Sequence, residues 1–159
     1  MKSGSMSVAP CAQRGMALLV SLVFLLLLTL IGISSMQNAT LQEKMAGSLG
    51  LRNQSFQLAE AVLRVGESAV QLETYSLPVC SGTTRCAPPA ESSTITGAGF
   101  NSTSGVTWIA SGSGFYGVQN IGTTKDAIGM SGTTVTLYRV TAVGLVGNSR
   151  SVLESVYAK

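Results

Sequence analysis

The feature that most constrains this chain is an uncharged apolar run near its N-terminus. Between Arg14 and Glu43 no side chain carries a formal charge, and residues 16–33 are apolar except for two hydroxyl residues and one glycine. At about 1.5 Å of rise per residue, a helix over residues 16–33 is roughly 27 Å long, close to the ~30 Å hydrocarbon core of a bilayer. The run is therefore long enough to cross a membrane.

The residues that flank the run do not fit an ordinary secretory signal peptide. Such a signal places a small-residue cleavage site after an apolar stretch of about 7 to 15 residues. Here the pair Arg14-Gly15 precedes the run. Small residues do follow it at 32–35, but the apolar stretch is long for a signal and the helical pattern continues through them. Cleaved export and a plain membrane anchor remain as alternatives.

A short hydrophilic leader that ends in Gly15, followed directly by an apolar helix from Met16, resembles the class III signal of type IV pilins and type II secretion pseudopilins. The resemblance implies that residues 1–15 form a leader, which a prepilin peptidase cuts after Gly15 on the cytoplasmic side. It also implies N-methylation of Met16 as the new N-terminus. The usual first residue in these families is Phe, so Met16 is a mild departure.

A second segment resembles the helix of PilX-type minor pilins. The residues that carry this similarity are Glu43, Met45, Gly47, Arg52, Phe56, Ala59, Glu60 and Arg64. The similarity covers about residues 13–64, and the ending at 138–157 is also similar. It implies a minor pilin that primes type IV pilus assembly, sits in a tip or minor-pilin complex, and supports twitching motility and adhesion. Implied partners are prepilin peptidase, other minor pilins and the major pilin.

The fifth residue after the expected cut is Val20. Type IV pilins usually have glutamate there, and by family resemblance that carboxylate pairs with the N-terminal ammonium of a neighbouring subunit. Since an unpaired buried charge is expensive, a subunit without the acid suits the end of a filament better than its repeating lattice. The K-type tip pseudopilin also lacks this glutamate. Alternatively, Val20 simply faces lipid.

The charge distribution predicts how the chain lies in the membrane. Lys2 and Arg14 precede the apolar run and no acidic residue does, so the positive-inside rule keeps the N-terminus cytoplasmic. We expect a single-pass inner-membrane protein whose C-terminal part is periplasmic and later enters the pilus, at its tip. Without those two charges the net charge of +3 becomes +1, which gives no basis for nucleic-acid binding.

The three cysteines divide between leader and mature chain. Cys11 leaves with the leader, so Cys80 and Cys86 remain as an even pair in a translocated domain. Such a pair predicts a disulfide in an oxidising compartment. A zinc site is disfavoured, because the sequence holds no histidine to complete a tetrahedral ligand set.

After the membrane segment 16–35, the pattern predicts an amphipathic helix over 36–75. Apolar residues recur at three- and four-residue steps, at Leu41, Met45, Leu49, Phe56, Ala59, Leu63, Gly66 and Val70. Glu60 and Arg64 lie one turn apart in the favourable order. Gly32 and Gly47 weaken the helix by ~1 kcal/mol each relative to alanine. This indicates either close helix contacts in the bilayer or a region that loosens when the subunit enters a filament.

Residues 76–159 predict a small β-rich globular domain. Short strand candidates occur at 106–109 and 115–119. The strongest signal is a terminal hairpin, in which strands at 133–143 and 151–157 are joined by turn residues at 144–148. The expected fold class is therefore α+β, with a long N-terminal helix packed on a small antiparallel sheet.

The residue inventory argues against an enzyme. Without histidine, Ser-His and Cys-His nucleophile pairs are excluded. The glycine clusters near 97–99 and 112–114 lack the residues of a phosphate loop, and no cofactor or metal site is expected. Alternatives to a pilus subunit are a K-type-like pseudopilin of type II secretion, a single-pass anchored periplasmic binding or adhesin domain and, least favoured, an anchored enzyme.

Overall fold

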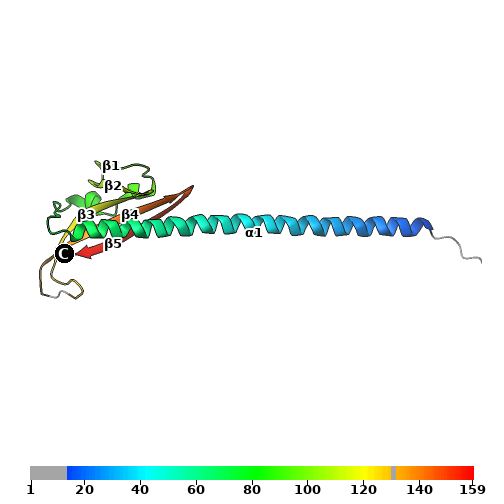
Figure 1. The fold of residues 1–159 in the computed structure, drawn as a ribbon, viewed down its shortest axis with the longest axis horizontal. Coiled ribbons are helices and arrows are strands. Elements are labelled where there is room, and N and C mark those ends of the chain that lie inside the picture. The colour runs from blue at the N-terminus through cyan, green and yellow to red at the C-terminus, as the bar shows by residue number, and fades with distance from the viewer. Residues whose placement is uncertain (1–13, 130–131) are drawn as a thin grey trace, which may run out of the picture. The chain divides into compact units, whose positions relative to one another are not determined.

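The computed structural model describes residues 14–129 and 132–159. Most of the expected leader, including Lys2 and Cys11, lies outside these residues. The chain divides into one unit that ends at Met45 and a second that runs from Ala46 to Lys159. Helix α1 (Arg14–Gln71) contributes to both, and each unit is described by itself (Figure 1).

In the first unit the described residues form continuous α-helix. The segment contains no proline, and leucine, alanine and methionine, which are strong helix formers, supply much of it. A Cβ atom added at Gly32 would meet no atom within 4 Å, so this glycine neither breaks the helix nor marks a close contact within the chain.

The second unit packs the C-terminal part of α1 on a five-stranded antiparallel sheet, which confirms the expected α+β class. The strands follow one another in space as they do in sequence (Figure 1). They are β1 (Gly99–Phe100), β2 (Thr107–Ser111), β3 (Gly114–Thr124), β4 (Val135–Val146) and β5 (Ser149–Ala158). A short helix α2 (Gly82–Cys86) and a 3-10 turn η1 (Ala90–Ser93) lie between α1 and the sheet in sequence.

The two faces of the sheet carry two separate apolar clusters, because successive strand residues point to opposite sides. On one face Tyr116, Val118 and Val140 pack against Val62 and Val70 of α1. On the other, Val106, Trp108 and Val143 are buried together, with Ile95, Phe115 and Leu145 packed around them. The sheet is thus covered by α1 on one side and by the segment that leads into β2 on the other.

Small residues let α1 approach the sheet closely. The buried positions along the helix are Ser55, Ala59, Val62, Gly66 and Val70, spaced three or four residues apart. A Cβ atom added at Gly144 of β4 would lie 2.5 Å from the backbone nitrogen of Ala59. The expected apolar face was therefore right for Ala59 and Val70 and wrong for Leu49 and Phe56, which are 60% and 49% exposed. The face that contacts the sheet is set by side-chain size as well as by apolarity.

The helix ends at Gln71, a few residues before the expected boundary near residue 75. A tight turn follows, in which the backbone N–H of Tyr75 donates to the carbonyl of Leu72 over 2.9 Å. The Lys159 ammonium donates to the carbonyls of Leu72 and Tyr75. A cation at this position is favourable, because the C-terminal end of a helix carries unsatisfied carbonyls and partial negative charge.

The terminal hairpin is present, with longer strands than expected. Its turn is the pair Gly147-Asn148, and Gly147 has a φ of 56°, a conformation that favours glycine. Strand β3 is also longer than the candidate at 115–119, because β4 pairs with it from Gly114 to Thr124 around an irregularity at Asn120 to Gly122.

Candidate functional site

The first candidate site is the apolar N-terminal part of α1. Among the described residues, α1 is the helix that is long and apolar enough to cross a membrane by length and composition. Its hydroxyl groups are satisfied within the helix: Ser21 Oγ donates to the carbonyl of Leu18 over 2.9 Å, and Thr29 Oγ1 donates to that of Leu26 over 2.8 Å. This matters because an unpaired polar group in hydrocarbon costs several kcal/mol. The segment is compatible with lipid on every side.

The expected processing and assembly positions lie on this segment. Met16, which follows Gly15, is 64% exposed, and Val20 is 45% exposed. Val20 lies on one side of the helix with a set of residues that are spaced at three- and four-residue steps. They are Met16, Ala17, Ser21, Phe24, Leu25 and Leu28. Val20 is thus part of a continuous apolar surface that can contact lipid or another apolar helix.

The family-like residues of the helix fall into two groups. Glu43, Met45 and Gly47 have no tertiary contact that buries them, and Met45 is 66% exposed. Arg52 and Phe56 also lie on the exposed side.

The remaining residues of that motif lie where α1 meets the sheet or beside it. Ala59 is fully buried under Gly144. Glu60 Oε1 accepts a hydrogen bond from Arg64 Nη2 over 2.6 Å, as the spacing predicts. Both partners of this pair are largely exposed, so it adds at most a few tenths of a kcal/mol.

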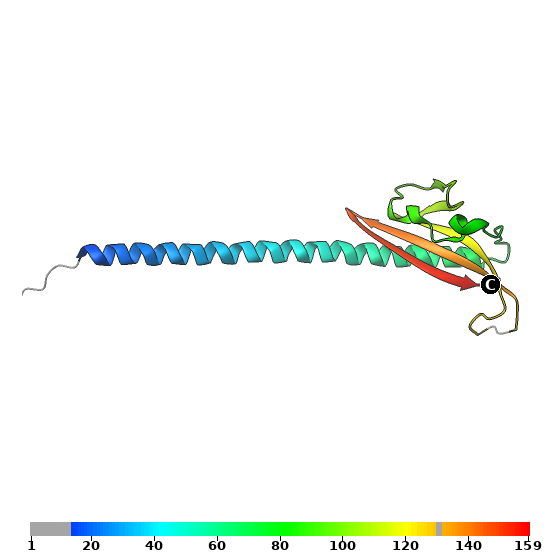
Figure 2. The same ribbon diagram turned by 180° about the vertical axis from the view of Figure 1, so that it is seen from behind.

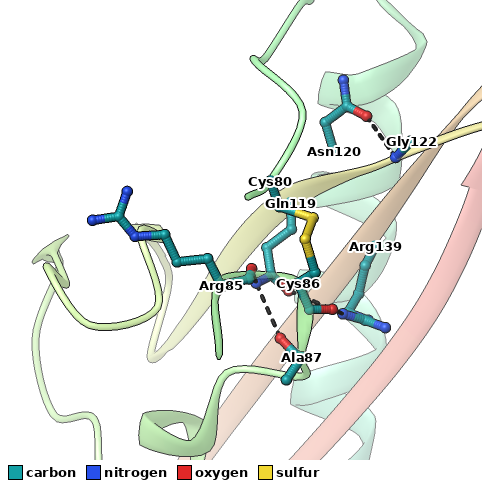
Figure 3. The surroundings of a disulfide bond; sticks show 8 residues. All are labelled: Cys80, Arg85, Cys86, Ala87, Gln119, Asn120, Gly122 and Arg139. Carbon is teal, nitrogen blue, oxygen red and sulfur yellow. Dashed lines mark hydrogen bonds between the residues drawn. A yellow bond between two sulfur atoms is a disulfide. The ribbon is translucent and has the colours of Figure 1, made fainter. Parts of the chain in front are cut away.

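The second candidate site is the segment closed by a disulfide between Cys80 and Cys86 (Figure 3). Polar side chains of the sheet donate hydrogen bonds to backbone carbonyls of this segment. Gln119 Nε2 donates to the carbonyls of Arg85 and Ala87 over 2.7 and 3.1 Å. Arg139 Nη1 donates to the carbonyl of Cys86 over 2.7 Å. The Arg85 guanidinium points away from these contacts toward solvent (Figure 3).

The start of the same segment is joined to β3. The backbone N–H of Cys80 donates to the carbonyl of Asn120 over 2.8 Å, and Asn120 Nδ2 donates to the carbonyl of Leu77 over 2.7 Å. The disulfide and these hydrogen bonds together hold a short loop with little apolar content in one conformation. Such a loop is a stable surface feature.

Comparison with known proteins bears on the helix. Residues 14–64 match the family model described as PilX N-terminal. The helix is thus similar to the N-terminal helix of PilX-type pilins. The match starts within the Arg14-Gly15 junction and ends at Arg64, so it takes in the whole apolar segment and the positions named above. The match therefore supports a PilX-type type IV pilin assignment for this part of the chain.

The rest of the chain has no counterpart in these comparisons. Residues 65–159 lie outside the family match, and neither the curated proteins nor the solved structures gave a match to the chain. What can be said of the sheet and the disulfide segment therefore comes from their own geometry.

Two residues that fasten the disulfide segment were missed by the sequence interpretation. Arg139 lies in the middle of β4, where its Nε also forms an ion pair with Glu154 Oε1 over 2.9 Å. The Arg139 side chain is only 14% exposed. A charged residue between Tyr138 and Val140 in a strand of apolar and β-branched residues was an available signal, because a charge in that setting needs a partner. Gln119 gave no comparable signal.

Besides Glu60 and Glu154, two further carboxylates of the second unit have structural partners. Glu91 accepts hydrogen bonds from Ser104 Oγ and from Trp108 Nε1, the latter over 3.2 Å. Glu67 accepts one from Ser155 Oγ over 2.6 Å. Within residues 14–129 and 132–159, no cluster of three or more histidine, cysteine, aspartate or glutamate residues could hold a metal ion. These acids stabilise loops and the helix–sheet contact.

One titratable group is perturbed near the end of α1. Burial raises the pKa of Tyr75 to about 12, with smaller contributions from Tyr116 and Tyr138. The Tyr75 and Tyr138 rings meet edge to face with centroids 5.8 Å apart. The phenol is therefore neutral throughout the physiological pH range and acts in packing.

Proposed function

We propose that this chain is a minor pilin that primes assembly of a type IV pilus and takes a position at the fibre tip, where it supports twitching motility and adhesion. The observation that carries the proposal is the apolar N-terminal segment itself. It combines a glycine junction, an uncharged helix with internally satisfied hydroxyls, and a match to the PilX N-terminal family model.

In the proposed mechanism the apolar helix, once processed at its N-terminus, exchanges lipid neighbours for protein neighbours. A prepilin peptidase removes residues 1–15, and Met16 becomes a methylated N-terminus. The apolar helix first holds the subunit in the inner membrane with its C-terminal domain in the periplasm. The same surface then leaves lipid and packs among the helices of other pilins, which costs little because both environments are apolar.

The tip position is supported by Val20. A subunit without a carboxylate at this point cannot pair with the N-terminal ammonium of the next subunit, and an unpaired ammonium inside a packed apolar core is unfavourable. A subunit at the end of a fibre has a neighbouring subunit on one side only, so it does not have to provide this carboxylate for a subunit beyond it. Val20 therefore suits a subunit that begins the fibre.

We further propose that the domain acts by binding other proteins and not by catalysis. Four of its described acids, Glu60, Glu67, Glu91 and Glu154, are used in structural contacts. Exposed apolar side chains along α1, such as Leu49 and Phe56, remain available to neighbouring subunits. A broad panel of hydrolase substrates that gave turnover with the purified chain would contradict this part of the proposal.

The decisive experiment is the N-terminal sequence and mass of the protein from sheared fibres. We expect a chain that begins at methylated Met16. The variant Gly15→Val should keep its leader, remain in the membrane and abolish the priming function, whereas Gly32→Ala should be processed normally. An intact leader on the wild-type protein in fibres would overturn the proposal.

The tip position has a separate test in Val20→Glu. We expect the added carboxylate to let the subunit enter the repeating part of the fibre, so that immunogold labelling spreads from fibre ends to fibre sides. Val20→Leu is the matched control and should leave the labelling at the ends. Side labelling of the wild-type protein would contradict the tip assignment and leave the pilin assignment intact.

A K-type-like pseudopilin of type II secretion also accounts for Val20. Co-purification of crosslinked complexes from membranes separates the two, since a pilus subunit brings down pilins and a pseudopilin brings down secretion components.

A further inference from the structure

Strand β5 forms one edge of the sheet, and nothing among the described residues covers that edge. The strand order ends at β5, and each of its ten residues pairs with a residue of β4 in unbroken register. Figure 2 shows β5, in red, along the free margin of the sheet. Its outer side therefore presents a row of backbone groups.

The register shows which residues present them. Thr136 and Lys159, just beyond the ends of the ladder, exchange two backbone hydrogen bonds of 2.6 and 2.9 Å. In an antiparallel pair such hydrogen-bonded positions alternate with positions whose backbone groups point away. The odd-numbered residues of β5 thus bond to β4, and the even-numbered residues direct N–H and C=O outward. These are Arg150, Val152, Glu154, Val156 and Ala158.

This edge lacks the devices that usually prevent strand addition. It contains no proline, no lysine and no bulge. Its two charged side chains are directed back over the sheet: Arg150 Nη1 and Nη2 donate to the carbonyls of Ser92 and Ile95 over 3.0 and 2.7 Å, and Glu154 pairs with Arg139. Val152 and Val156 are 39% and 54% exposed on the same face.

The charges along the edge of β5 are complementary to those of a second, antiparallel copy of the same strand. When β5 is laid antiparallel to a second β5 with Val152 opposite Val152 of the partner subunit, Arg150 lies opposite Glu154 of the partner subunit, and Glu154 lies opposite Arg150 of the partner subunit. Opposite charges facing each other across a ladder are stabilising and like charges are destabilising. Sliding one strand by two residues in either direction places Val152 opposite Glu154 or Arg150, so the charge pairs are lost. Sliding it by four residues places Glu154 opposite Glu154 or Arg150 opposite Arg150.

We propose that the outer edge of β5 is a self-association surface, at which a second copy of this chain adds antiparallel in the Val152-centred register. The contact is isologous, as closed two-fold dimers require. It gives three hydrogen-bonded residue pairs and extends the sheet across the two subunits. The inference goes beyond the proposed function and depends only on the sheet.

The two-fold axis reverses the direction of β5, so the paired domains run in opposite directions. The test is therefore made with the full chain in detergent solution, where a membrane does not impose a common direction. Hydrogen-bonded positions in antiparallel pairs have Cα atoms about 5.5 Å apart, which is within the range that a disulfide can bridge.

The experiment compares two single cysteines in a Cys11→Ser background. Val152→Cys should form an intermolecular disulfide under mild oxidation, because the two residues lie on the axis. Val156→Cys is the matched control: it is on the same face and more exposed, but in this register the two copies of residue 156 are about 26 Å apart along the strands. Crosslinking at 152 at least tenfold above 156 supports the proposal. Equal crosslinking, or none at 152, overturns it.

A second measurement does not depend on an introduced thiol. Val152→Pro removes one outward N–H that no described residue uses, and proline is tolerated on a sheet edge. We expect its dimer dissociation constant, measured by sedimentation, to rise at least tenfold, while Val152→Thr stays close to the unsubstituted chain. Because all variants carry the same apolar stem, micelle-driven association cancels in this comparison. A monomeric unsubstituted chain, or a dimer insensitive to Val152→Pro, contradicts the proposal.

Discussion

The N-terminal and C-terminal parts of α1 use opposite kinds of surface. Residues 16–33 carry large apolar side chains such as Leu25 and Ile31, 66% and 67% exposed, and bury none of them in the chain. Residues 55–70 bury a row dominated by small side chains, including Ser55 and Ala59, which are fully buried. One continuous helix thus has one part whose stability comes from its surroundings and another whose stability comes from close packing within the domain.

This difference teaches that apolar composition and burial are separate properties of a helix. In the first part, bulk provides the apolar area that lipid or other helices contact. In the second, small size lets backbone approach backbone, and close packing then supplies many weak contacts. The following substitutions test this difference between the two parts of α1. For each of them, unfolding is monitored by the fluorescence of Trp108, the sole tryptophan, which is buried in the second unit.

The largest effect is expected from Gly144→Ala. Its Cβ would be driven into the backbone of α1, within 2.5 Å of the Ala59 nitrogen, and backbone atoms cannot move aside as a side chain can. We expect the free energy of unfolding to fall by about 3 kcal/mol in denaturant titration. Gly32→Ala is the same change where a Cβ meets no atom, and it should leave the Trp108 transition unchanged. Equal effects would remove the distinction between the two parts.

The next effect concerns the sheet face that α1 does not cover. Replacing both Cys80 and Cys86 by serine releases a short ring, and loop-closure entropy assigns it about 2 kcal/mol of stability. The hydrogen bonds from Gln119 and Arg139 to this segment should weaken as well. Cys11→Ser, outside the described residues, serves as the control. An unchanged unfolding midpoint would show that those hydrogen bonds hold the segment without the disulfide.

A smaller effect is expected from Ser55→Ala. Ser55 Oγ is within 3.1 and 2.8 Å of the hydroxyls of Ser149 and Ser151, so it links α1 to β5. Removing it should lower the free energy of unfolding by about 1 kcal/mol. Ser68 bonds only to the carbonyl of Arg64 in its own helix, and Ser68→Ala should change stability less. The reverse order would mean that the hydroxyl link contributes nothing.

The smallest effect is confined to high pH. The Tyr75 pKa is raised to about 12 chiefly by burial, so the folded state holds the phenolic proton where the unfolded state, with a pKa near 10, has lost it. Stability from this group is complete below pH 10 and is lost as the pH rises toward 12. Tyr75→Phe should make the decline between pH 10 and 12 shallower. A decline as steep as that of the unsubstituted chain would assign it to other groups.

Much of this architecture was accessible from local sequence patterns. The uncharged run after Gly15 required a helix able to enter a membrane, since its length and apolarity depend only on consecutive residues. The pair Cys80 and Cys86, the ion pair of Glu60 and Arg64, and the terminal hairpin were likewise predicted from short spacings. Each of these features joins residues that are close in sequence.

The features that were missed or wrong depend on pairings between distant residues. The burial of Ser55 and the exposure of Phe56 follow from where Gly144 of β4 lies under the helix, which no helical periodicity contains. The extension of β3 to Thr124, and the role of Gln119 and Arg139 beneath the disulfide segment, follow from cross-strand register.

The sequence by itself therefore determined what kind of surface each segment offers: an apolar stem, an amphipathic helix and a β-rich domain with one disulfide. Only the tertiary structure decided which face of α1 is buried, the order of the five strands and the free edge at β5. The physical reason is that hydrophobicity and propensity act through neighbours in the chain, whereas steric fit and backbone hydrogen bonding are settled between segments that meet only when the domain is folded.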